Sequence, residues 1–129
     1  MVLWAQNSLN AIPEISLFTN EKSILPGITA FDTSGHSPGH SSILVESEGS
    51  KLIIGGDVFR NTYTSLKNPD FIPDTDMDPV KAKKTRHEIL DLLTKEKIAY
   101  LGYHFPFPGV GHIIAHEKSY EFIPASIRW

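Results

Sequence analysis

The chain has 129 residues, of which 40% are apolar, and it carries 15 acidic and 12 basic side chains for a net charge of -3. A chain of this length and composition is expected to fold as one domain around one core, which excludes intrinsic disorder and fibrous proteins. The slightly acidic balance gives no electrostatic basis for binding nucleic acid. Because the sequence has no cysteine, any metal must bind to His, Asp or Glu.

The sequence also shows no pattern typical of a membrane span or a signal peptide. No apolar run approaches the roughly 18 residues that span a membrane, and the first residues lack the basic and apolar regions of a signal peptide. We therefore expect residues 1–129 to form a single domain of a cytoplasmic protein, without a membrane partner.

Three short segments in the first half of the chain have the composition of β-strands. After a Pro-Gly turn signal, apolar and polar side chains alternate over residues 27–31. Residues 42–46 and 51–54 are rich in aliphatic side chains, and a short polar loop containing Gly49 joins them. Such a loop between two strand-like runs predicts an antiparallel pair.

One long helix and three further strands follow. Asp78-Pro79 predicts the helix start, because Asp is a favourable N-cap and Pro suits the first helical position. Residues 97–101 predict a buried strand, and residues 111–116 and 119–123 predict a closing hairpin. Strands on both sides of a helix predict an α/β or α+β fold. The helix is expected to end near Lys95, and its periodic face consists of Ala82, Arg86, Ile89, Leu90 and Leu93.

Three of the predicted strands run into loops that carry a side chain able to bind a metal, namely His36, Asp57 and His104. Because the ends of neighbouring strands lie close together, two imidazoles and one carboxylate can converge on one point. Nitrogen and oxygen donors of this kind suit zinc or another divalent transition ion. Each of these residues alone also fits an ordinary role in a turn or a helix cap. The interpretation as a metal site therefore rests on the occurrence of all three at the ends of predicted strands.

The remaining histidines are expected to be structural. His112 and His116 are four residues apart, but they lie in the predicted hairpin and lack the glutamate of a helical zinc-protease motif. His87 lies in the middle of the long helix and is expected to be a solvated surface residue.

Two further clusters have plain interpretations. Phe105 and Phe107 belong to a proline-rich loop that is expected to be packed, with one ring as a candidate wall of a substrate pocket. Asp74 and Asp76 resemble the start of a calcium loop, but the glycine and the closing glutamate of that motif are missing. They are expected to be loop carboxylates, with Asp78 as the helix cap.

Three motifs follow one another along the chain: Thr33-Ser-Gly-His-Ser-Pro-Gly-His40, then Ile54-Gly-Gly-Asp57-Val, then His104-Phe-Pro-Phe-Pro-Gly-Val-Gly-His112. In this order they resemble the second half of the metallo-β-lactamase-fold hydrolases. Together with residues 71–76, the last motif is most similar to the branch that contains methyl parathion hydrolase and lactonase-like enzymes. The resemblance implies half of an αββα sandwich, with one mixed sheet and a helix on one face.

The resemblance also implies roles for individual residues. His36 corresponds to a ligand of the first metal, His104 to a ligand of the second, Asp57 to the carboxylate that bridges both, and His40 to a position behind the ligands. The implied chemistry is hydrolysis of an ester, lactone or phosphoester by a hydroxide that bridges the two ions. Zinc is the expected cofactor, and iron and manganese also accept these ligands.

One signature of the family, H-x-H-x-D-H, does not occur in this sequence. Each metal would keep one histidine and a share of Asp57, which is fewer than the three protein ligands of a catalytic zinc. We therefore expect weak or no metal binding by this chain alone. We also expect an exposed apolar sheet face, covered either by a second copy in a two-fold dimer or by a complementing N-terminal half.

Two hypotheses follow for the function. In the first, the chain is the C-terminal half of a metal-dependent hydrolase that acts on a small ester or lactone once the other half is supplied. In the alternative, it is a catalytically inactive truncated module that associates with itself through the sheet face. Whether the isolated chain is an enzyme is left open by the sequence, and the coding sequence upstream would distinguish the two.

Overall fold

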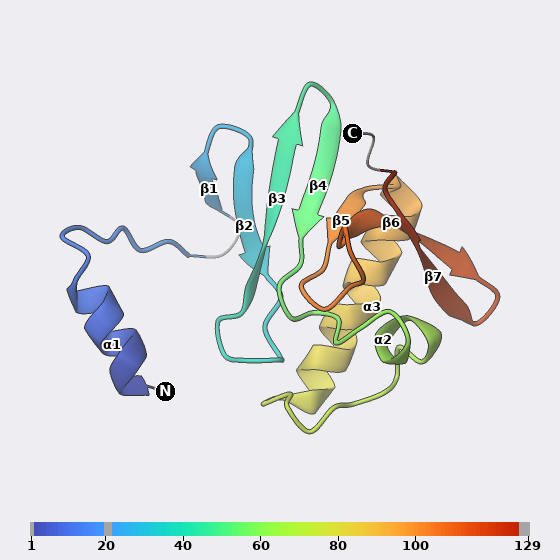
Figure 1. Cartoon of the computed structure of the whole chain (residues 1–129), viewed down its shortest axis with the longest axis horizontal. Helices are drawn as coiled ribbons and strands as arrows, with labels where there is room; N and C mark the ends of the chain where they lie inside the picture. Colours follow the sequence, from blue (N-terminus) through green and yellow to red (C-terminus); the bar gives the residue numbers. More distant parts are fainter. Residues whose placement is uncertain (1, 20–21, 127–129) are drawn as a thin grey trace.

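The computed structural model describes residues 2–19 and 22–126 and contains a seven-stranded mixed sheet (Figure 1). The strands lie in the sheet in chain order, and neighbours are antiparallel except β4 and β5, which are parallel. Helices α2 and α3 lie in the crossover between these two strands. The elements are α1 (Val2–Asn10), β1 (Lys22–Leu25), β2 (Ile28–Asp32), β3 (Ser41–Ser47), β4 (Ser50–Ile54), α2 (Thr64–Lys67), α3 (Pro79–Glu96), β5 (Ala99–Leu101), β6 (Val110–His116) and β7 (Ser119–Pro124).

The predicted fold class is confirmed, and five of the seven strands together with α3 match predicted segments closely. The strand predicted over residues 97–101 is shorter, because Lys97 adopts the left-handed conformation (φ 54°) that ends α3. Three elements have no counterpart in the prediction. Strand β1 is exposed along its whole length, α2 is a single turn whose first backbone N donates to the Asn61 side chain, and α1 has no acidic residue in its first turn.

Helix α3 forms where the sequence predicts it. The Asp78 side chain accepts a hydrogen bond from the Lys81 backbone N at 3.0 Å, and Pro79 occupies the first turn. The predicted apolar face is the buried face of the helix, and it includes the charged residue Arg86.

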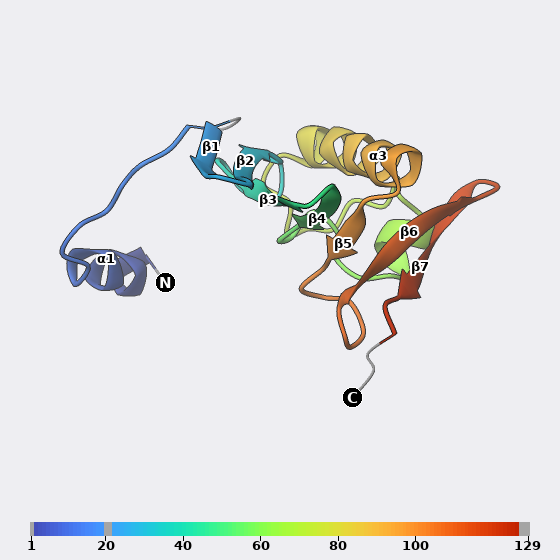
Figure 2. The same ribbon diagram turned by 90° about the horizontal axis from the view of Figure 1, so that it is seen from above.

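The core lies between α3 and one face of the sheet. Ile53 and Tyr100 point from the neighbouring strands β4 and β5 toward α3, which contributes Leu90 and Leu93. Figure 2 shows α3 on this side of the sheet. The rings of Phe59, Tyr100 and Phe105 pack together in the same cluster, with centroids 5.0 to 6.1 Å apart. This cluster anchors the segments that follow β4 and β5.

The opposite face of the sheet, from β2 to β5, has no helix over it in Figure 2. We call it the open sheet face. Strand register places its side chains in two rows across the sheet, and most of them are only half-buried although they are aliphatic. They are Ile28, Ala30, Ile43, Val45, Leu52, Ile54, Ala99 and Leu101.

Residues 3–19 form an arm that extends away from the sheet (Figure 1). All of its side chains are exposed, including Leu3 and Trp4 in α1 and Leu17 in the segment after it. Within the described residues, no helix has the length and apolar character needed to cross a membrane.

Candidate metal centre

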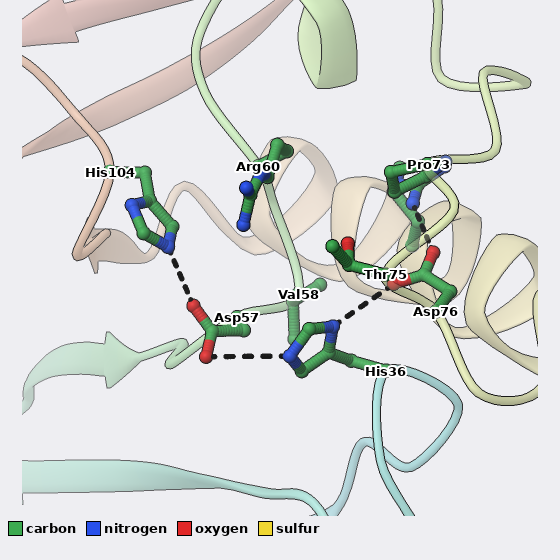
Figure 3. A pocket seen from close by; sticks show the side chains of 9 residues that line it. His36, Asp57, Val58, Arg60, Pro73, Thr75, Asp76 and His104 are labelled. Carbon is green, nitrogen blue, oxygen red and sulfur yellow. Dashed lines mark hydrogen bonds and ion pairs between the residues drawn. The ribbon is translucent and has the colours of Figure 1, made fainter.

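The three side chains predicted to bind metal meet at one carboxylate. His104 Nε2 lies 2.8 Å from Asp57 Oδ1, and His36 Nε2 lies 3.7 Å from Asp57 Oδ2 (Figure 3). The three residues come from loops after β5, β4 and β2, so the sheet brings together positions that are far apart in the sequence. Each imidazole faces a different oxygen of the same carboxylate.

The loop that carries His36 is attached to the start of α3. The Met77 backbone N donates to the His36 carbonyl at 3.1 Å, and the Asp78 N donates to the Gly35 carbonyl at 2.9 Å. Gly35 has φ +136°, and a Cβ added there would lie 2.3 Å from the Ala82 backbone N. Only glycine permits this close approach of loop and helix.

His40 lies behind Asp57 and holds it in place. Its Nε2 accepts a hydrogen bond from the Asp57 backbone N at 3.0 Å, and its Nδ1 donates to the Thr33 carbonyl at 3.0 Å. Gly56 makes room for this ring, since a Cβ there would come within 2.7 Å of His40 Nε2. Both ring nitrogens of His40 are therefore engaged by protein groups, which supports a positioning role.

The loop that carries His104 is fixed by its neighbour Phe105. The Phe105 ring is buried against Phe59 and Tyr100, whereas Phe107 is 80% exposed. A packed loop is therefore the correct description for Phe105, and Phe107 is the ring that is available to a ligand.

Two residues of the site were not predicted to belong to it. Asp76 Oδ1 lies 3.1 Å from His36 Nδ1, and Asp76 Oδ2 lies 3.3 Å from Arg86 Nη2. Both the Asp76 carboxylate and the Arg86 guanidinium are almost fully buried. Asp76 lies in a loop, as expected, but tertiary contacts bury its carboxylate, which was not predicted from the sequence. The signal that could have identified the pair is the charged residue on the apolar face of α3.

Burial lowers the pKa of the Arg86 guanidinium, and the neighbouring Asp76 carboxylate opposes this shift. Arg86 Nη1 also donates to the carbonyls of Pro69 (2.9 Å) and Phe71 (2.6 Å). The arginine thus connects α3 to the loop before it at three oxygen atoms.

The other candidate residues lie elsewhere. His87 is on the surface of α3, where its Nε2 lies 2.9 Å from Asp70 Oδ1, and both side chains are exposed. His112 and His116 are exposed side chains of β6. None of the three lines the pocket around Asp57, whose walls include His36, His104, Arg60, Thr75 and Asp76.

The donor atoms fit part of a two-metal site. A carboxylate with one imidazole at each oxygen can serve two divalent ions, and an ionised carboxylate beside His36 is the usual outer partner of a metal-bound imidazole. Each ion would have one nitrogen and one oxygen from these residues. Among the described residues, no group of three or more His, Cys, Asp or Glu side chains is arranged to hold one ion. A catalytic site therefore requires further donors.

Comparisons with known proteins identify relatives of this chain. No protein-family model matches the chain. An N-acyl homoserine lactonase of Bacillus thuringiensis is 31% identical over 104 residues, which cover 81% of this chain and 38% of the relative. A second N-acyl homoserine lactonase, from a Bacillus species, is 27% identical with the same coverage. The chain thus spans less than two fifths of the length of these curated relatives.

Two solved structures are similar over most of the chain. The hydrolase AbOPH of the β-lactamase superfamily gives a TM-score of 0.80 at 29% identity, covering 85% of this chain and 38% of its own. The dizinc quorum-quenching lactonase AidC, solved with a product, gives 0.88 at 26% identity, covering 99% of this chain and 44% of its own. The chain therefore has the fold of metallo-β-lactamase-superfamily hydrolases, and its relatives are lactonases and hydrolases that match it over their C-terminal part.

Proposed function

We propose that this chain supplies the C-terminal part of a metal-dependent hydrolase that acts on a lactone or a related ester. The observation that carries the proposal is the meeting of His36 and His104 at the two oxygens of Asp57. The relatives named as lactonases favour a cyclic ester as substrate. The narrower resemblance to the methyl parathion hydrolase branch stays a prediction, as does a cytoplasmic location.

Zinc or a similar divalent ion, when bound, would polarise the scissile carbonyl and lower the pKa of water. The residues of this chain would hold such ions with one imidazole nitrogen each, from His36 and His104, and with the oxygens of Asp57. His40 fixes the backbone of Asp57. The backbone position of Asp57 is therefore set by the protein before any ion binds.

Arg60 places a positive charge where an anionic product would be released. It lines the same pocket, beside His104 in Figure 3. Hydrolysis of a lactone or an ester produces a carboxylate, and a guanidinium binds carboxylates through two parallel hydrogen bonds. Arg60 is thus placed to bind the acid that the reaction releases.

The test is hydrolysis of an N-acyl homoserine lactone in the presence of zinc by three samples. These are the chain alone, the chain mixed with the part of AidC that the match leaves out, and that AidC part alone. We expect turnover in the mixture only. His36→Ala and Asp57→Ala should abolish it, whereas Asp70→Ala, which removes an exposed carboxylate beside a surface histidine, should leave it unchanged.

Two results would change the conclusion. Turnover by the chain alone, lost in the same two variants, would show that no second segment is needed. Absence of turnover in a mixture whose complex is verified by size would favour the second function, a non-catalytic module that associates with itself. The lack of a complete metal-binding group among the described residues is the observation behind that alternative.

A further inference from the structure

A chain of polar contacts extends from the candidate metal centre into the interior of the protein. It begins at Asp57, passes through His36 to Asp76 and ends at Arg86. The Asp76 side chain is 4% exposed and that of Arg86 is 3% exposed. A buried ion pair of this kind rarely adds much stability, because desolvation offsets the attraction. Stability alone therefore does not explain why Asp76 and Arg86 are paired here.

The geometry assigns a proton to His36. An ionised carboxylate has no hydrogen to donate, so at 3.1 Å from Asp76 Oδ1 the His36 Nδ1 must be the donor. In a neutral ring the other nitrogen, Nε2, then carries a lone pair. That nitrogen faces Asp57 Oδ2 at 3.7 Å, which is too long for a hydrogen bond. The lone pair is thus directed at the place where a metal would bind.

Asp76 can perform this task because it is itself held. One oxygen contacts Arg86 Nη2 and the other contacts His36, so both oxygens have a partner. Arg86 in turn donates to two carbonyls of the loop before α3. The carboxylate has little freedom to rotate away from the imidazole.

We propose that Asp76, locked by Arg86, is a positioning residue that fixes the tautomer and the orientation of His36, leaving its Nε2 free to bind a divalent ion. The metal half of this proposal rests on the proposed function, and the tautomer half does not. His104 is different, because its Nε2 lies at hydrogen-bond distance (2.8 Å) from Asp57 Oδ1 and must carry a proton to make that bond.

Nitrogen NMR of the imidazole rings tests the tautomer in the uniformly ¹⁵N-labelled chain at pH 8, where an ordinary imidazole is neutral. In the unsubstituted protein we expect a protonated Nδ1 and an unprotonated Nε2 at His36. Finding the proton on Nε2 would overturn the proposal without any variant. Asp76→Asn should move the proton to Nε2, because the Asn amide can donate to Nδ1 while its oxygen still accepts from Arg86.

Two variants control this result. Asp70→Asn removes the carboxylate from the exposed pair with His87 and should leave the His36 signals unchanged. Asp76→Glu keeps a carboxylate and should keep the proton on Nδ1. An unchanged tautomer in a folded Asp76→Asn variant would contradict the proposed role of Asp76.

Zinc titration of the labelled chain, mixed with the part of AidC that the match leaves out and followed through the His36 ring signals, tests the metal half. Loss of an outer carboxylate partner typically weakens metal binding about 10- to 100-fold, and we expect this loss in Asp76→Asn but not in Asp70→Asn. Equal affinity in the two variants would contradict the metal half. If the expected tautomer is found but zinc leaves the His36 ring signals unchanged in a mixture whose complex is verified by size, the proposed metal site fails while the positioning of His36 by Asp76 stands.

Discussion

His36 and His40 are four residues apart in one loop, yet their ring nitrogens have different surroundings. His40 is engaged at both nitrogens by the backbone of Thr33 and Asp57. Within the described residues, His36 is at hydrogen-bond distance at Nδ1 only, from a side chain that lies 40 positions further along the chain, while its Nε2 lies 3.7 Å from Asp57 Oδ2. Sequence spacing alone cannot distinguish these two histidines, because the difference arises from contacts that only the folded chain provides.

Tyr100 is the residue whose chemistry fits its surroundings least well. Its side chain is fully buried, and its hydroxyl has no hydrogen-bond partner within the described residues. Burial raises the pKa of this hydroxyl above its ordinary value, with a further contribution from the Asp57 charge. Removing the hydroxyl should therefore help the folded state rather than harm it.

We predict that Tyr100→Phe raises the free energy of unfolding by about 1 kcal/mol at pH 7, because an unpartnered buried hydroxyl costs about that much. Because the pKa is raised in the folded state, ionisation favours the unfolded chain as the pH rises above about 10. The variant should lose this part of the alkaline destabilisation. Urea unfolding at pH 7 and 10.5 measures both effects.

Tyr103→Phe is the matched control, because Tyr103 is 71% exposed and its substitution should change neither quantity. A lower stability of Tyr100→Phe at pH 7 would show that the hydroxyl has a partner in solution.

Among the elements, α3 supports the part of the site that carries His36. Its capping signal and its apolar period are local, which is why its position could be predicted from the sequence. Its docking could not be predicted, because it depends on backbone hydrogen bonds between residues 77–78 and the loop around His36. The pairing of Arg86 with Asp76 could not be predicted for the same reason. It joins the helix to the loop before it, and helical periodicity describes only the helix.

The contact between this loop and α3 gives a prediction about glycine. Gly35→Ala should lower the free energy of unfolding by about 3 kcal/mol or more, because the new Cβ overlaps the Ala82 backbone and φ +136° is strained for any other residue. Gly39 lies in the same loop with φ +75°, but open space surrounds it. Gly39→Ala should cost only about 1 kcal/mol. Urea denaturation of both variants provides the comparison, and equal losses would mean that the helix can move aside.

On the scale of the whole molecule, the sheet determines what the chain exposes. Alternation over residues 27–31, together with aliphatic runs and turn signals, predicted the central strands. Short edge strands such as β1 give a weak signal, and the described side chains of α1 are all exposed, so packing leaves no pattern there. The parallel pairing of β4 and β5 places Ile53 and Tyr100 on the α3 side, and the aliphatic side chains of Ile54 and Leu101 on the open sheet face. Within the described residues, α3 covers the first pair, whereas the second pair is only half-buried.

We predict that the 129-residue chain associates with itself through the open sheet face, as a two-fold dimer. Ile43 lies on this face beside Ala30 and Ile54, so Ile43→Lys should shift the protein to a monomer. Val80→Lys, which changes an apolar residue that is 80% exposed on α3, should leave the dimer intact. Light scattering over a range of concentrations measures the mass, and circular dichroism verifies that both variants are folded.

The same measurement connects the dimer to the proposed function. If a completing segment docks on the open sheet face, it must displace the second copy, since one face cannot bind both. Adding the AidC part should then convert the dimer to a complex of one chain with one segment. A monomeric mass at every concentration would contradict the predicted dimer. A complex that retains two copies of the chain would mean that the two partners use different surfaces.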